Sequence, residues 1–235
     1  MAPLLEVREL SLRLGGQPIL ERVSFTVEQG ALVGLIGPNG AGKTSLLETV
    51  AGLLPASGGE VLWGGRCLAA GERAAAMFYL PDGIRPCPDH RASDLLELFR
   101  LANSQPAVLA RDLVAALGLE SVLPQRIHAL SKGFSKRLLL ALGLLTRAPL
   151  LLLDEPLDGL DVRQVRALQG LIEGLRRQRR TLLLSVHELA LAQRLCESFL
   201  LLEEGRLLAA GGLGALREQA GLASGGLEDV FLALT

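Results

Sequence analysis

Polar and apolar residues alternate in two stretches near the start of the chain. "LEVRELSLRL" (residues 5–14) and "RVSFTVEQG" (residues 22–30) have this pattern and end near glycines, which predicts antiparallel strands with one solvent-facing side. Three other stretches are apolar almost throughout: "ALVGLIG" (31–37), "PLLLLDE" (149–155) and "TLLLSVHE" (181–188). Such runs are typical of strands buried on both faces, in a parallel sheet that helices cover. The pattern therefore predicts an α/β protein.

Between residues 84 and 147 the apolar residues change to helical spacing. Leu, Val and Ala recur at intervals of three and four over residues 93–103, 107–119 and 136–147, which predicts three helices. Residues 161–180 form a further amphipathic pattern that ends in an arginine cluster. We interpret this cluster as a solvated face that suits the negative end of the helix dipole, rather than as a nucleic-acid patch.

These patterns predict one domain with internal subdivisions. The expected parts are a nucleotide-binding α/β core over residues 1–83 and 148–212, an inserted helical subdomain over 84–147, and a C-terminal helical tail over 213–235.

Composition narrows the classes of function. Hydrophobic residues make up 49% of the chain and 24 Lys and Arg nearly balance 25 Asp and Glu, so we exclude full-length disorder and expect no global attraction to nucleic acid. No uninterrupted apolar run reaches the roughly 18 to 20 residues that cross a bilayer. The first residues also lack a basic segment followed by a long apolar one. We therefore expect a cytoplasmic protein that reaches a membrane only through a partner.

The stretch "GPNGAGKT" (37–44) satisfies the phosphate-binding pattern G-x-x-x-x-G-K-[ST], and it lies between a predicted buried strand and a predicted helix. Its glycines let backbone N–H groups approach phosphates, while the lysine reaches the β- and γ-phosphates and the threonine hydroxyl binds Mg²⁺. The guanine-reading pattern Asn-Lys-x-Asp is absent, although a small-molecule kinase stays possible on these residues alone. The predicted nucleotide-binding residues here are Gly37, Pro38, Asn39, Gly40, Ala41, Gly42, Lys43, Thr44 and Ser45.

Acidic residues follow the second buried strand. Asp154 and Glu155 come after four leucines, at the carboxyl end where α/β sheets bind ligands. We expect Asp154 to hold Mg²⁺ through water and Glu155 to orient or deprotonate the attacking water. Asp161 could steady the next loop across an interface, and His187 follows the next strand, where a bond to the γ-phosphate region is expected. The alternatives are a helix-capping acidic pair and a structural histidine.

A third motif, "LSKGFS" (130–135), lies between the phosphate loop and the acidic pair. The order of the motifs resembles that of the ATP-binding-cassette (ABC) ATPases, and the resemblance covers essentially the whole chain. The segment "LSKGF" matches the family signature "LSGGQ" at Leu130, Ser131 and Gly133. The resemblance implies a RecA-like P-loop NTPase core with an antiparallel β subdomain and an inserted α-helical subdomain. It also implies that two cassettes enclose two ATPs, with the helix start at Ser131 and Gly133 facing the partner's γ-phosphate. From its residue type alone, Ser131 would be a simple N-cap.

The sequence departs from the family pattern at four positions. Lys132 and Phe134 replace a glycine and a glutamine, a form like the "LSKG" signatures of many export-type ATPases. Asp82 occupies the place of a glutamine that usually senses Mg²⁺, and we predict that it is a metal ligand with Thr44 and Asp154. Leu14 stands where an aromatic residue often stacks on adenine, so we expect apolar contact with the base and weak discrimination between ATP and GTP.

The resemblance predicts an ATPase subunit of an export-type ABC transporter, with Lys43, Glu155 and His187 as catalytic residues. The C-terminal "LEDVFLALT" (227–235) resembles the ending of export-type cassettes. The implied partners are a second cassette, identical or paralogous, and a separate permease with about six membrane-spanning helices, on the inner face of the cell membrane. Nucleic acid is not expected. Two alternatives remain: a soluble ATPase of the same family that acts on ribosomes or DNA, and a nucleotide-binding regulatory module with low turnover.

Overall fold

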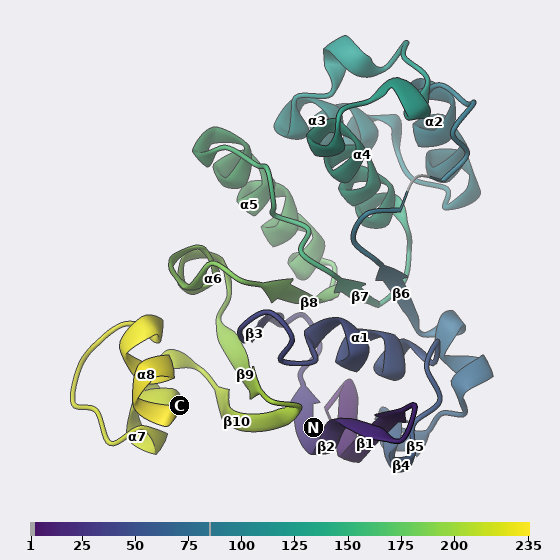
Figure 1. The fold of residues 1–235 in the computed structure, drawn as a ribbon. Coiled ribbons are helices and arrows are strands. Elements are labelled where there is room, and N and C mark those ends of the chain that lie inside the picture. The colour runs from purple at the N-terminus through teal and green to yellow at the C-terminus, as the bar shows by residue number, and fades with distance from the viewer. Residues whose placement is uncertain (1–2, 85) are drawn as a thin grey trace.

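The computed structural model of the protein describes residues 3–84 and 86–235, which contain two sheets and the helices that pack on them (Figure 1). One sheet has four strands in the order β2-β1-β4-β5, and its pairings are antiparallel. Its strands are β1 (Leu5–Leu14), β2 (Gln17–Val27), β4 (Gly58–Trp63) and β5 (Arg66–Cys67). The two alternating stretches form the antiparallel pair β1 and β2, as their pattern predicts, whereas β4 and β5 were not predicted.

The second sheet has six strands in the order β10-β9-β3-β8-β7-β6. Neighbouring strands from β9 to β6 are parallel, and only the β9–β10 hairpin is antiparallel. The strands are β3 (Leu32–Ile36), β6 (Met77–Leu80), β7 (Leu150–Leu153), β8 (Thr181–Val186), β9 (Ser198–Glu203) and β10 (Arg206–Gly211). Every residue of β3, β7 and β8 is buried, which confirms the prediction made from their continuous apolar runs.

Alternate residues of the central strands contribute to two separate cores. Leu35 and Leu152 pack with the antiparallel sheet and helix α1 (Lys43–Ala51), whereas Ile36 and Leu153 pack with helices on the other face. Those helices are α2 (Ala92–Ala102), α3 (Ala107–Leu117), α4 (Lys132–Leu145), α5 (Val162–Arg177), α6 (Leu189–Leu195), α7 (Leu213–Gln219) and α8 (Leu227–Leu234). The central sheet therefore separates α1 from α4 (Figure 1).

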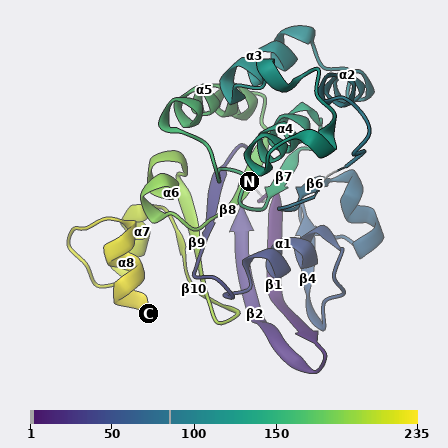
Figure 2. The ribbon, with the colours of Figure 1, turned by 45° about the horizontal axis from the view of Figure 1, so that its top comes forward.

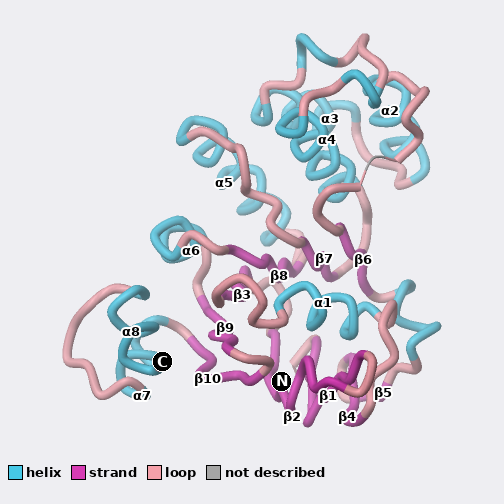
Figure 3. The backbone as a smooth tube through the Cα atoms, viewed as in Figure 1, coloured by secondary structure: helices cyan, strands magenta, loops and turns pink. Residues whose placement is uncertain are grey.

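Helices α2, α3 and α4 gather beyond β6 and β7, while α7 and α8 lie beside β10 at the other end (Figure 2). Short 3₁₀ turns cover Ala70–Ala75, Glu120–Val122 and Ile127–Ala129. Figure 3 shows that the loop leaving β6 runs to the helical group, from which the chain returns through α4 to β7. Helices α2, α3 and α4 lie within residues 84–147, and α7 and α8 lie within residues 213–235, the two segments predicted to be helical. The subdomain boundaries themselves stay predictions. In the described part of the chain, no helix combines the length and apolar character needed to cross a membrane.

The arginine cluster at the end of α5 is only partly a solvated face, so that interpretation was incomplete. Arg177 is exposed, but Arg180 is buried and donates to the carbonyl oxygens of Leu144 (2.7 Å) and Ala148 (3.3 Å). Burial lowers the Arg180 pKa to about 10, which leaves the guanidinium charged at neutral pH. Arg180 therefore satisfies carbonyl groups at and beyond the C-terminal end of α4, a role that the arginine-rich pattern did not reveal.

We expect Arg180→Ala to lower the free energy of unfolding by about 2–4 kcal/mol, because it leaves buried carbonyl groups without donors. Urea denaturation monitored by circular dichroism measures this change. Arg177→Ala is the matched control, since its side chain is 78% exposed, and it should change stability by less than about 0.5 kcal/mol. Equal stability of the two variants would contradict the proposed capping role of Arg180.

Candidate functional site

The phosphate-loop sequence connects β3 to α1. Lys43 is the first residue of α1 and is buried, and its Nζ donates to the carbonyl oxygens of Gly37 (2.8 Å) and Pro38 (2.9 Å). Burial lowers the Lys43 pKa, while the charges of Glu155 and Asp154 act in the opposite direction. The loop thus holds a desolvated ammonium group at the start of a helix, where backbone N–H groups favour an anion.

Glycine is required in this loop for two different reasons. At Gly37, a Cβ atom would lie 2.1 Å from the backbone oxygen of Leu202, so the end of β9 leaves no room for a side chain. At Gly40 and Gly42, φ is +83° and +101°, a backbone conformation that residues with a Cβ rarely adopt. The close approach of the loop to β9 and its left-handed turns explain these three glycines.

A hollow of about 370 Å³ lies over the loop and the start of α1, and Glu155 also lines it. Its lining residues are Ile19, Asn39, Gly40, Gly42, Lys43, Thr44, Ser45 and Glu155. Ile19 comes from β2 and was not predicted. Leu14, the predicted contact for the base, lies at the end of β1, is 42% exposed and is not among these residues. Its role at the adenine stays a prediction, and Ile19 is the apolar side chain that the fold brings to the hollow.

Oxygen atoms suited to a magnesium ion lie together beside this hollow, where Thr44 contacts Asp154. The Thr44 hydroxyl donates to Asp154 Oδ2 at 2.7 Å, and the Ser185 hydroxyl donates to Asp154 Oδ1 at 2.5 Å. Asp154 is buried at the end of β7, and Ser185 lies in β8, the neighbouring strand. Because Mg²⁺ prefers carboxylate, hydroxyl and phosphate oxygens, Thr44 and Asp154 fit the ion that the sequence predicts.

Glu155 follows Asp154 and has a φ of +46°, which is unusual for a residue with a side chain. Its backbone N–H donates to the Ser185 hydroxyl at 2.8 Å. Burial, followed by the nearby carboxylates of Asp158 and Asp154, raises the Glu155 pKa, while His187 acts to lower it. Ser185 therefore contacts both acidic residues, and the raised pKa makes the Glu155 carboxylate a stronger base.

His187 lies close to Glu155, and its partner is a residue that the sequence analysis did not select; its bond to the γ-phosphate region stays a prediction. His187 Nδ1 is 3.2 Å from Asp158 Oδ1, and one ligand-type atom from each of Glu155, Asp158 and His187 lies within 4.8 Å of the others. The same three residues line a polar hollow of about 270 Å³. Asp158 thus belongs to the site, and its only sequence signal was the acidic loop "DEPLDGLD".

Asp82, the third predicted metal ligand, lies in the loop after β6. Its Oδ1 is 2.8 Å from Nζ of Lys136, a residue of α4 whose side chain is 11% exposed. The loop borders Asp154 and Glu155 in a small crevice, so Asp82 lies near the acidic pair while its carboxylate pairs with Lys136. Its role as a Mg²⁺ ligand stays a prediction.

The signature residues stand at the start of α4. Ser131 is the N-cap, and its hydroxyl accepts from the backbone N–H of Phe134 at 3.3 Å. Among the residues that the structure describes, nothing lies within 4 Å of a Cβ built on Gly133, and Ser131 and Lys132 beside it are exposed, so this helix start is open to solvent. The Phe134 ring lies 4.2 Å from the guanidinium carbon of Arg137, which gives the unusual phenylalanine a cation–π contact.

Asp161 serves its own chain as the N-cap of α5. Its Oδ1 accepts from the backbone N–H groups of Arg163 (2.8 Å) and Gln164 (2.9 Å), and the Gln164 side chain bonds back to the Asp161 N–H (3.0 Å). This capping box accounts for the aspartate locally. A contact of Asp161 across an interface stays a prediction.

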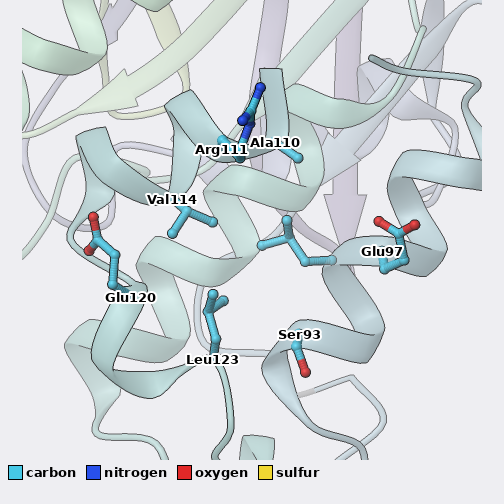
Figure 4. A pocket seen from close by; sticks show the side chains of 8 residues that line it. Ser93, Glu97, Ala110, Arg111, Val114, Glu120 and Leu123 are labelled. Atoms are coloured by element: carbon cyan, nitrogen blue, oxygen red, sulfur yellow. The ribbon is translucent and has the colours of Figure 1, made fainter. Parts of the chain in front are cut away.

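A separate, mainly apolar hollow of about 360 Å³ lies among α2, α3 and the turn at Glu120–Val122 (Figure 4). Leu96, Ala110, Val114 and Leu123 supply apolar lining, and Glu97, Arg111 and Glu120 add charges. It shares no lining residue with the hollow over the phosphate loop. None of the residues that the sequence predicts for nucleotide chemistry lines this hollow.

Comparison with known proteins identifies a family. The model of the family described as "ABC transporter" matches residues 20–158. The chain is 31% identical to the ABC-type transporter ATP-binding protein EcsA of Bacillus subtilis, over 99% of this chain and 96% of that protein. It is 34% identical to the zinc import ATP-binding protein ZnuC of Saccharophagus degradans (84% of this chain, 75% of that one). It is 31% identical to the Nod factor export ATP-binding protein I of Ralstonia nicotianae (89% and 67%).

Solved structures agree with these relatives. The structure titled "Structure of ATP binding subunit of ABC transporter" superposes with a TM-score of 0.87 at 32% identity, over 98% of this chain and 99% of that one. The fold predicted from the sequence, a P-loop NTPase core with antiparallel and helical additions, is therefore confirmed. The chain belongs to the ABC transporter family, as an ATP-binding subunit that hydrolyses ATP.

Proposed function

We propose that two copies of this cassette, or this cassette and a paralogue, close on two ATP molecules and drive export through a membrane-spanning permease. One observation carries the proposal: the open start of α4 at Ser131 is separate from the phosphate loop of its own chain. The central sheet lies between α1 and α4, and Ser131 is not among the described residues lining the loop's hollow. The Ser131 of a second chain can instead approach the γ-phosphate of an ATP bound in that hollow.

Each residue of the site has a defined role in this proposal. Lys43 exchanges its two loop carbonyls for the β- and γ-phosphates, and Glu155, whose pKa is raised, orients or deprotonates the attacking water. His187 contacts the γ-phosphate region from the next strand end. Thr44 and Asp154 would hold a magnesium ion, which neutralises charge on the phosphates when it is bound.

ATP would then join the two cassettes because each γ-phosphate contacts both chains, and hydrolysis would release them. We propose a separate permease as the membrane partner, with the cassette at the inner face. The Lys132 form of the signature supports export, as does the likeness to Nod factor export proteins. The likeness to the zinc import protein makes direction the part of the proposal that most needs a test.

A mixing experiment tests the shared site. Lys43→Ala removes the phosphate contact, and Ser131→Glu places a like charge beside the γ-phosphate, so each variant alone should be inactive in a phosphate-release assay. In a mixed dimer, one site combines the intact Lys43 of one chain with the intact Ser131 of the other. Mixtures should therefore regain activity, and activity no greater than the sum of the separate variants would contradict the shared site.

Direction is tested in inside-out membrane vesicles that contain the cassette and its native permease. Export predicts that external ATP drives a fluorescent lipid or hydrophobic drug probe into the vesicles. Release of preloaded probe on addition of ATP would indicate import. Vesicles that carry the Glu155→Gln cassette control for passive movement of the probe.

A further inference from the structure

A largely buried cation connects the signature helix to the catalytic loops. Lys136 lies on α4, five residues after the N-cap Ser131, and its side chain is only 11% exposed. Its Nζ lies 2.8 Å from Asp82 Oδ1 and 3.2 Å from Asp158 Oδ2. One ammonium group thus holds two carboxylates from separate loops.

The two carboxylates stand at the ends of adjacent parallel strands. Asp82 follows β6 and Asp158 lies in the loop after β7. The other oxygen of Asp158 is 3.2 Å from His187 Nδ1, and His187 follows β8, the next strand in the sheet. A continuous series of polar contacts therefore runs from α4 across three strand ends to His187, beside Glu155.

We propose that Lys136 is a positioning residue for ATP hydrolysis: it holds Asp158, which fixes the orientation of the His187 ring, and it ties that arrangement to the signature helix. The inference rests on the proposed function. Its physical basis is charge, because Asp82, Asp158 and Glu155 are acidic groups crowded at one edge of the sheet. Without the Lys136 ammonium, Asp158 loses its cation and the loop that carries it is free to turn away from His187.

A plain structural role for Lys136 would be to attach α4 to the core. Such a role predicts loss of stability with no selective effect on turnover. The positioning role predicts a fall in kcat with little change in ATP affinity, because Lys136 does not line the hollow over the phosphate loop. Comparing the change in kcat with the change in stability therefore distinguishes the two roles.

The experiment uses the full chain and measures ATPase kinetics, ATP affinity and thermal unfolding. Lys136→Met should lower kcat about 10-fold or more and change the Kd for ATP by less than about 3-fold. Lys136→Arg keeps the cation and should recover most of the rate. Arg100→Met is the matched control, because Arg100 is also largely buried (19% exposed) in the helical group and pairs with Glu97 at 2.6 Å. It should leave kcat unchanged.

A double-mutant cycle tests whether Lys136 acts through Asp158. If it does, Lys136→Met combined with Asp158→Asn should be no slower than the slower single variant, because both changes break the same connection. The inference is overturned if the two losses of rate multiply, if Lys136→Met keeps the wild-type kcat, or if Lys136→Gln and Lys136→Met lower only the unfolding temperature.

The wild-type protein distinguishes failure of this inference from failure of the proposed function. If the wild type does not hydrolyse ATP, the proposed function is contradicted. If the wild type and Lys136→Met are both active, this inference alone is contradicted.

Discussion

Replacing Glu155 with glutamine is expected to slow ATP hydrolysis at least about 100-fold while ATP binding persists. The amide has nearly the same shape as the carboxylate but cannot accept a proton from water. The backbone bond from Glu155 to the Ser185 hydroxyl does not involve the changed atoms, so the loop should keep its conformation. Phosphate release measures the rate, and a fluorescent ATP analogue measures binding.

The same variant should accumulate the ATP-bound pair of cassettes. Light scattering in the presence of ATP and Mg²⁺ should give about twice the 24.9 kDa mass of one chain. Glu203→Gln is a matched control, since Glu203 is the last residue of β9 in the same sheet whose strand β7 precedes Glu155, and it lines neither polar hollow at the site. It should hydrolyse ATP at the wild-type rate. Rapid turnover by Glu155→Gln would remove Glu155 from the role of base.

Strands were predictable from the sequence where burial on both faces requires a continuous run of apolar residues. The apolar runs of β3, β7 and β8 could not lie at a surface, so their position inside a helix-covered sheet followed directly. The β1 strand is more subtle, because Leu5 and Val7 are buried together with Leu10 and Leu12, so the buried positions change from odd to even numbers. The structure resolves this change with a register shift between Val7 and Leu10.

The phosphate loop and the acidic strand end were also predictable, because their chemistry depends on short segments of sequence. Contacts made by the fold were not. Asp158 and Lys136 are 22 residues apart in sequence, and only the packing of α4 beside β6 and β7 brings them together. Ser185 left a weak signal, since it is a polar residue within an otherwise apolar buried strand. Such a residue must find a partner, and here it contacts both Asp154 and Glu155.

Lys43→Met is expected to weaken ATP binding about 10- to 100-fold, since a charge-assisted hydrogen bond contributes about 1.5–3 kcal/mol. The protein without nucleotide should unfold close to the wild-type temperature, because two effects oppose each other. Lys43→Met leaves the Gly37 and Pro38 carbonyl oxygens without their donor, but it also removes a charge that was costly to desolvate, and methionine retains the apolar stem. Loss of binding without loss of stability is therefore the expected signature of this residue.

Thermal unfolding with increasing ATP, with EDTA present to prevent hydrolysis, measures both effects in one experiment. At an ATP concentration 100 times the wild-type Kd, binding stabilises wild type by about 2.7 kcal/mol and should stabilise Lys43→Met by less than about 1.5 kcal/mol. Arg147→Met is the control, because Arg147 also donates to a backbone oxygen, that of Ser104 at 2.7 Å, but lies exposed after α4. It should keep the full ATP-dependent shift. An equal shift for Lys43→Met and wild type would mean that the buried ammonium stays with its loop carbonyls when ATP binds, and phosphate binding would then depend on the backbone N–H groups of the loop alone.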